Sequence, residues 1–161
     1  MKTQSAGILL YRKTFGVTEV LLVHPGGPYW AKRDDAAWSV PKGEIGNDED
    51  SWSAAKREFL EETSLSLPEV TKLDLGEFRV TSSKIATAWA VNGDADLDKF
   101  KSNDFEMEWP PKSGRMQQFP EVDKAGWFTL AQARVKLVKG QVQILDKLAE
   151  VLGIEDQTNS A

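Results

Sequence analysis

The sequence predicts an α/β fold in which strands precede and follow one central helix. Apolar runs of strand length, bounded by turn residues, occur on both sides of the segment Ser51–Thr63. That segment contains no Pro or Gly and is rich in good helix formers. After the last strand pattern, apolar residues recur at helical spacing on both sides of Gly140, which predicts a C-terminal pair of helices.

The predicted strands cover 5–12, 19–24, 37–40, 73–81, 84–91 and 125–128. The first two are almost continuously apolar, as expected of strands that are covered on both faces. His24, the single histidine, ends the second strand and is expected to be structural or partly exposed. The C-terminal helices are expected at 130–138 and 142–152. We expect residues 1–155 to form one domain and 156–161 to form a frayed tail.

The composition excludes several classes of protein. Of the 161 residues, 40% are hydrophobic and 28% charged, which is typical of a globular protein. No run of 18 apolar residues occurs, so no membrane span or membrane partner is expected. The absence of cysteine excludes disulfides and is compatible with a cytoplasmic location, which we expect. A net charge of −5 argues against binding along an extended nucleic acid, and the oligomeric state stays open.

The central helix separates an apolar side from an acidic side at about 100° per residue. Its cap is expected at Asp50 or Ser51. Glu58, Glu61 and Glu62 follow i, i+3 and i+4 spacing, so their carboxylates converge on the acidic side. The apolar side, expected to pack against a sheet, is formed by Trp52, Ala55 and Phe59.

Three like charges on one patch repel one another, which favours a bound cation among them. Oxygen ligands without cysteine or a usable histidine predict Mg²⁺ or Mn²⁺ rather than zinc. A solvated acidic face with no metal is equally compatible with the spacing.

The segment from Gly43 to Leu65 resembles the Nudix box, in which Gly, five residues, Glu and seven residues precede Arg-Glu-hydrophobic-x-Glu-Glu-x-Gly-hydrophobic. Ser64 departs from this pattern, because the family has Gly there. A glycine just past a helix end usually supplies a left-handed cap, and serine in that conformation costs about 1 kcal/mol. The matching positions are Gly43, Glu49, Arg57, Glu58, Phe59, Glu61, Glu62 and Leu65.

The resemblance to the Nudix family implies an α/β/α sandwich with a mixed sheet. It also implies metal-dependent hydrolysis of a nucleoside diphosphate linked to another group. By this resemblance the metal ligands are Glu58, Glu61 and Glu62, together with the carbonyl of Lys42.

Two further residues receive roles from the same resemblance. Arg57 is expected to orient Glu61. Glu121 lies six residues before Trp127, as in several Nudix hydrolases, which suggests an additional metal ligand or the general base. The sequence does not decide whether Glu61 or Glu121 accepts the proton of the attacking water.

Several residues outside the box are candidates for contacting the substrate. The ammonium of Lys42 can reach a phosphate, and rings in the long irregular stretch 94–119 can stack on a base. Solvated charges, and rings that only hold a loop in place, are the alternative interpretations. The segment 25–30, PGGPYW, is expected to be a turn-forming loop. The other candidates are Arg33, Phe105, Trp109 and Arg115.

The start of the chain, the Pro-Lys-Gly before the box and the Glu-to-Trp spacing are similar to the diadenosine tetraphosphate hydrolase group of the family. This similarity implies asymmetric cleavage to ATP and AMP. Nucleoside or deoxynucleoside triphosphates, RNA 5′ ends and sugar nucleotides are alternative substrates. A Nudix-fold module that binds a nucleotide without hydrolysing it is a further alternative, although such a module would not need all the box glutamates.

Overall fold

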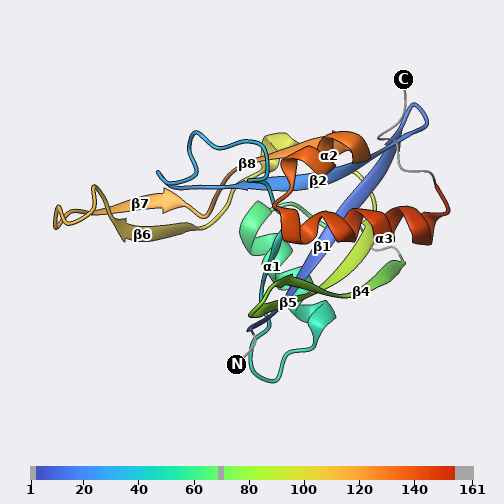
Figure 1. The fold of residues 1–161 in the computed structure, drawn as a ribbon, viewed down its shortest axis with the longest axis horizontal. Helices are drawn as coiled ribbons and strands as arrows, with labels where there is room; N and C mark the ends of the chain where they lie inside the picture. The colour runs from blue at the N-terminus through green and yellow to red at the C-terminus, as the bar shows by residue number, and fades with distance from the viewer. Residues whose placement is uncertain (1–2, 69–70, 155–161) are drawn as a thin grey trace.

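Helices cover both faces of a mixed β-sheet in the computed structural model, which describes residues 3–68 and 71–154 (Figure 1). This is the predicted α/β/α sandwich. The described strands are β1 (Thr3–Thr14), β2 (Val17–Pro25), β3 (Lys42–Glu44), β4 (Lys72–Thr81), β5 (Lys84–Asn92), β6 (Asp104–Glu108), β7 (Met116–Pro120) and β8 (Val122–Thr129). The described helices are α1 (Ser51–Thr63), α2 (Leu130–Lys136) and α3 (Val142–Leu152), with short 3₁₀ turns at Leu97–Lys99 and Lys139–Gln141.

Six of the described strands form one sheet in the order β4-β5-β1-β2-β8, with β3 paired to β1. β1 and β5 run parallel, and the other pairs are antiparallel. The first half of β1 pairs with β3, where Ser5 faces Glu44, and its second half pairs with β2, where Tyr11 faces Val20. Pairing with the central strand β1 therefore holds β3 in place, and the loop 45–50 joins β3 to α1.

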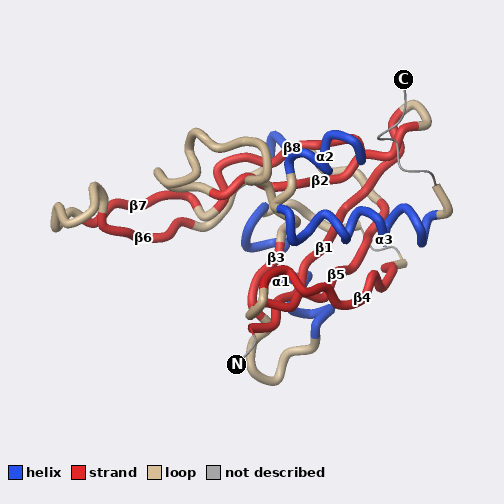
Figure 2. Tube along the Cα trace, in the orientation of Figure 1, coloured by secondary structure: helices blue, strands red, loops and turns tan. Residues whose placement is uncertain are grey.

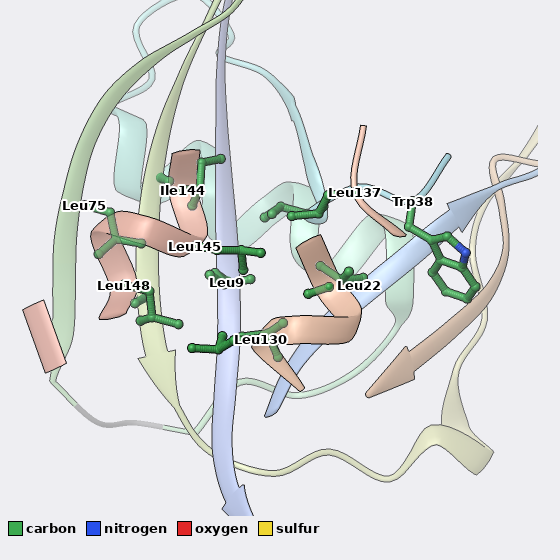
Figure 3. Packing of buried hydrophobic residues seen from close by; sticks show 14 of the residues in the cluster. Leu9, Leu22, Trp38, Leu75, Leu130, Leu137, Ile144, Leu145 and Leu148 are labelled. Atoms are coloured by element: carbon green, nitrogen blue, oxygen red, sulfur yellow. The ribbon is translucent and has the colours of Figure 1, made fainter. Parts of the chain in front are cut away.

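Successive residues of β1 point to opposite faces of the sheet, and both faces are covered. Ile8 and Leu10 pack in the cluster that contains Phe59 of α1. Leu9 packs on the other face with residues of β2, α2 and α3, such as Leu145 (Figure 3). The near-continuous apolar runs of β1 and β2 therefore reflect burial on two sides, as predicted.

The two ends of α1 are closed by polar side chains. The carboxylate of Asp50 caps the first turn by accepting the N–H of Ser53 at 2.7 Å. At the other end Ser64 adopts φ 59°, and its N–H donates to the Leu60 carbonyl at 2.8 Å. The Ser64 hydroxyl donates to the carbonyl of Lys101 at 2.6 Å. Serine therefore keeps the left-handed helix end that the family pattern assigns to glycine.

This geometry predicts the stability of two variants at position 64. Both Ser64→Gly and Ser64→Ala remove the hydroxyl, but alanine keeps the cost of a positive φ. We expect Ser64→Gly to be the more stable of the two by about 1 kcal/mol, measured by denaturant unfolding. Equal stabilities would show that residue 64 leaves the left-handed conformation when the hydroxyl is absent.

The predicted strand at 37–40 is wrong. The described residues there form only isolated bridges, from Ser39 to Val23 and from Trp38 to Leu137. Trp38 packs in the cluster under α2 and α3, and its indole N–H donates to Asp34 at 2.8 Å. The apolar run arises from burial against the helical layer, and regular pairing starts only at β3. The helix predicted at 130–138 is also shorter, since α2 ends at Lys136.

The stretch 94–119, predicted to be irregular, contains a hairpin of β6 and β7 that projects from the sandwich (Figures 1 and 2). Along β6 the half-buried Phe105 and Met107 alternate with exposed acidic residues, and Phe105 pairs with Phe119. This period of two is the strand signal that the sequence interpretation missed. The tail 156–161 lies outside the described residues. None of the described helices is long and apolar enough to cross a membrane.

Candidate active site

Arg57 on α1 lies at the centre of a network of carboxylates. Its Nε and Nη2 bind both oxygens of Glu49 at 2.8 and 2.9 Å. Its Nη1 donates to Glu58 at 2.8 Å and to Glu61 at 3.2 Å. Nη2 also donates to the carbonyl of Glu44 in β3 at 3.0 Å. The guanidinium therefore joins the strand, the following loop and two acidic residues of the helix.

The bidentate pair with Arg57 makes Glu49 an anchor of the loop. Hydrogen bonds from Arg57 and from the Gly46 N–H lower the pKa of Glu49 to about 2. The same carboxylates raise the pKa of Arg57. Glu49 therefore stays ionised and paired, which explains a glutamate at this motif position without a role in chemistry.

Gly43 of β3 leaves the space that the Glu58 carboxylate occupies. A Cβ at position 43 would lie 2.0 Å from Cδ of Glu58. Gly43 pairs with Ala6 of the central strand, so its backbone is held in the sheet. The first glycine of the motif is thus required by the side chain that the motif places fifteen residues later.

Glu62 is the most desolvated carboxylate of the cluster. Its Oε1 accepts the N–H of Lys42 at 3.1 Å. Burial, with the negative charges of Glu58 and Glu121, raises the pKa of Glu62 to about 8, although the Lys42 N–H opposes the shift. Burial lowers the pKa of the Lys42 ammonium, against the attraction of Glu62 and Glu58. Lys42 of β3 therefore interacts electrostatically with Glu58 and Glu62 of α1.

Glu121 connects β7 to β8 and brings a further carboxylate to this cluster. Its N–H donates to the Asn103 carbonyl at 2.7 Å, and its carbonyl accepts the N–H of Gly26 at 2.9 Å. Burial, together with the charges of Glu58 and Glu61, raises the pKa of Glu121. The fold therefore places Glu121 within electrostatic reach of the box carboxylates, more than fifty residues away in sequence.

The raised pKa of Glu62 predicts that the stability of the metal-free protein depends on pH. Between the ordinary pKa of 4.5 and about 8, the folded state holds a proton that the unfolded state has lost. Stability should therefore fall as pH rises through this range, by at most about 1.4 kcal/mol per pH unit from this group. Denaturant unfolding in a chelating buffer measures the slope, and Glu62→Gln should remove this component. A variant with the wild-type slope would contradict the assignment.

Of the other candidate residues, Arg33 lies in the loop after β2, and Trp109 and Arg115 lie between β6 and β7. Arg33 is exposed, and its guanidinium carbon lies 5.4 Å from the centre of the Trp30 ring. Arg115 is exposed and adjoins the turn at the free end of the hairpin, where its carbonyl accepts the N–H of Trp109 at 2.9 Å. Trp109 itself packs edge-on against Tyr29, with ring centres 5.2 Å apart. Within the described residues, no hydrogen bond, ion pair or ring contact joins these three residues directly to the box carboxylates.

Phe105 differs, because it lines a pocket that reaches Glu121. The pocket measures about 340 Å³ and is enclosed by the loop 25–30 on one side and β6 on the other. Sequence reasoning missed Tyr29 and Trp30, since it interpreted their loop only as a turn. Their signal was a pair of neighbouring aromatic residues after two glycines. The lining residues are Pro25, Gly26, Gly27, Pro28, Tyr29, Trp30, Phe105, Met107 and Glu121.

His24 is a structural residue, which is the first of the two roles expected from the sequence (structural or partly exposed). Its ring is fully buried, with Nδ1 2.8 Å from Asp123 and Nε2 2.5 Å from the Arg33 carbonyl. These contacts tie the loop after β2 to β8. His24 therefore supports the loop that carries the pocket and is not available as a ligand.

The donor set of the carboxylate cluster suits a hard divalent cation. Glu58, Glu61 and Glu62 offer oxygens only, and the desolvated Glu62 has a single backbone N–H as its hydrogen-bond donor. Among residues 3–68 and 71–154, no three His, Asp or Glu side chains already stand in a metal-ligand arrangement. Arg57 donates to one oxygen of Glu58 and to one oxygen of Glu61, so each carboxylate keeps a second oxygen with which to bind a cation.

Residues 1–148 match the NUDIX domain, and the chain therefore belongs to the Nudix family. It is 35% identical over 71 residues to the bis(5′-nucleosyl)-tetraphosphatase [asymmetrical] of Caenorhabditis elegans, a match that spans 44% of this chain and 47% of that protein. The match thus spans about half the length of this curated relative. Family and relative together support the prediction of a Nudix pyrophosphohydrolase.

Solved structures of Nudix proteins have a similar fold. A C. elegans Ap4A hydrolase binary complex is 25% identical, with a TM-score of 0.56 over 94% of this chain and 98% of that one. The NUDIX domain of Shewanella oneidensis NrtR, in complex with ADP ribose, is 18% identical, with a TM-score of 0.62 over 94% and 89% of the two chains. The second likeness supports the fold alone.

Proposed function

We propose that this protein hydrolyses a phosphoanhydride bond in a nucleoside diphosphate linked to another group, with Mg²⁺ or Mn²⁺ as cofactor. The observation that carries the proposal is the meeting of Glu58, Glu62 and Glu121, which come from two distant segments and whose negative charges repel one another. Such a cluster of like charge is costly unless a cation is bound there.

Glu58, Glu61 and Glu62, with the Lys42 carbonyl, would hold the cation. When bound, such an ion neutralises pyrophosphate charge and makes water a better nucleophile. Arg57 holds Glu61 by a hydrogen bond and orients its carboxylate. The Lys42 ammonium, next to the carboxylates, is suited to contact a phosphate of the substrate.

For the general base, Glu121 is favoured over Glu61. Arg57 donates a hydrogen bond to one oxygen of Glu61, which holds that carboxylate against the guanidinium. The Glu121 carboxylate has no hydrogen bond or ion pair with the part of the chain that the structure describes, and its pKa is raised. A base with a pKa nearer to neutrality transfers a proton more effectively. Glu121 would thus accept the proton of the attacking water.

A dinucleoside polyphosphate such as diadenosine tetraphosphate is the favoured substrate. The partial match to the C. elegans tetraphosphatase and the fold of the Ap4A hydrolase complex support this choice. Nucleoside triphosphates, RNA 5′ ends and sugar nucleotides are the alternatives, as is nucleotide binding without hydrolysis. Phe105 is proposed to contact the substrate from the pocket beside Glu121. Arg33, Trp109 and Arg115 stay predictions as further contacts.

A nucleotide panel with Mg²⁺ tests the proposal, with products identified to locate the attacked phosphorus. We expect diadenosine tetraphosphate to give ATP and AMP with the highest kcat/KM of the panel. Much faster turnover of triphosphates or sugar nucleotides would replace the substrate and keep the reaction class. Turnover of no member would refute the hydrolase proposal, and turnover that persists in a chelator would refute the metal cofactor.

A further inference from the structure

We propose that the pocket between the loop 25–30 and β6 binds a nucleobase of the substrate by ring stacking, which makes the hairpin β6–β7 a substrate-binding element. This inference rests on the nucleotide substrate proposed above. The pocket volume of about 340 Å³ lies within the range of small-molecule sites, and its walls come from two segments that are distant in sequence.

The lining chemistry favours a flat, uncharged ring. Tyr29 and Trp30 contribute aromatic rings from the loop, while Phe105 and Met107 contribute an aromatic ring and a thioether from β6. Every nucleobase has a π face that can stack on such side chains. Among the described lining residues Glu121 carries the single charge, and it is negative. The described lining residues include no cation to bind a phosphate, whereas their apolar side chains can pack against a heterocycle.

The position of the pocket fits the rest of a nucleotide. Glu121 lines the pocket and also interacts electrostatically with Glu58 and Glu61 of the box. The pocket therefore opens beside the carboxylate cluster. A nucleotide with its base between the aromatic walls would direct its phosphates towards those carboxylates and towards Lys42.

The two walls are built to meet closely. Gly27 has φ 95°, and a Cβ there would lie 3.1 Å from the tip of the Phe105 ring. A Cβ on Gly26 would lie 1.9 Å from the Pro120 carbonyl oxygen, so the loop backbone presses against the end of β7. Tyr29 remains 59% exposed, and its ring lies at 79° to that of Trp109, so exposed ring surface is left for a ligand. The glycine pair thus serves the approach of the hairpin as well as the turn.

Binding of AMP and of ribose 5-phosphate, measured by calorimetry in the presence of Mg²⁺, tests the pocket without relying on turnover. The two probes differ only in the base. Phe105→Ala and Tyr29→Ala should each raise the Kd for AMP by about 5- to 140-fold, the effect of removing one stacking ring. Both should leave the Kd for ribose 5-phosphate unchanged. The matched control is Phe15→Ala, which removes a fully exposed ring at the β1–β2 turn and should change neither Kd.

Equal affinity of the wild-type protein for AMP and ribose 5-phosphate would refute the proposal that the pocket binds the base. So would an unchanged Kd for AMP in the ring variants. If Phe105→Ala does not fold, the exposed Tyr29 decides the outcome. Base-dependent binding without cleavage of any phosphoanhydride would support the pocket and refute the hydrolase. Cleavage without base-dependent binding would do the reverse.

Discussion

Glu58→Gln and Glu61→Gln are each expected to lower kcat at least about 100-fold while the protein stays folded. Glutamine keeps the size of the side chain and one oxygen acceptor, so the contact with Arg57 at 2.8 or 3.2 Å can be retained. What is lost is the negative charge that binds the divalent cation. The effect should therefore appear in turnover and in metal affinity rather than in stability.

The measurement is steady-state hydrolysis across a range of Mg²⁺ concentrations, with denaturant unfolding as the check on folding. Glu77→Gln is the matched control, because Glu77 is an exposed glutamate on β4, outside the carboxylate cluster. We expect that control to retain wild-type kcat. Unchanged turnover in both box variants would refute the proposed roles of Glu58 and Glu61 in hydrolysis.

Gly43→Ala should abolish most activity with little loss of stability. The added methyl would lie 2.0 Å from the Glu58 Cδ, so this carboxylate has to move. The atoms in conflict are the far end of a flexible side chain, which can rotate at low cost. Displacement of a reacting group by about 1 Å lowers the rate about 100-fold, which sets the expected loss in kcat.

A double-mutant cycle with Glu58→Gln separates this mechanism from general disruption of β3. If the methyl acts only by displacing Glu58, the double variant should be as active as Glu58→Gln alone. Additive losses would instead show that Gly43→Ala disturbs other parts of the site. A large fall in the free energy of unfolding would point to the backbone of β3.

The acidic side of α1 could be predicted from sequence because a helix fixes the relative directions of residues three and four apart. The Arg57–Glu61 pair followed from the same rule and is present at 3.2 Å. The bidentate pair of Arg57 with Glu49, eight residues away, depends on how the loop returns along the helix. No local periodicity contains that information, and only the folded loop shows it.

The two errors, a strand predicted at 37–40 and the missed strand β6, also arise because tertiary contacts cannot be read from local sequence. The run at 37–40 is apolar because α2 and α3 cover it, and burial by helices resembles burial in a sheet when only the sequence is read. The β6 strand was missed because the stretch 94–119 is rich in Asp, Lys, Pro, Ser and Gly, which suggested a loop. The alternation of half-buried and exposed residues along β6 nevertheless follows the strand period.

Sequence alone predicts the family, the α/β order of the elements and the helix that carries Glu58, Glu61 and Glu62, because each of these follows from local residue patterns. Which distant groups join these carboxylates depends on how the chain folds. Pairing of β2 with β8 brings Glu121 to the carboxylates, and the projecting hairpin brings Phe105 to Tyr29 and Trp30. Burial and mutual repulsion then raise the pKa of Glu62, an effect that exists only once the chain has removed water from that carboxylate.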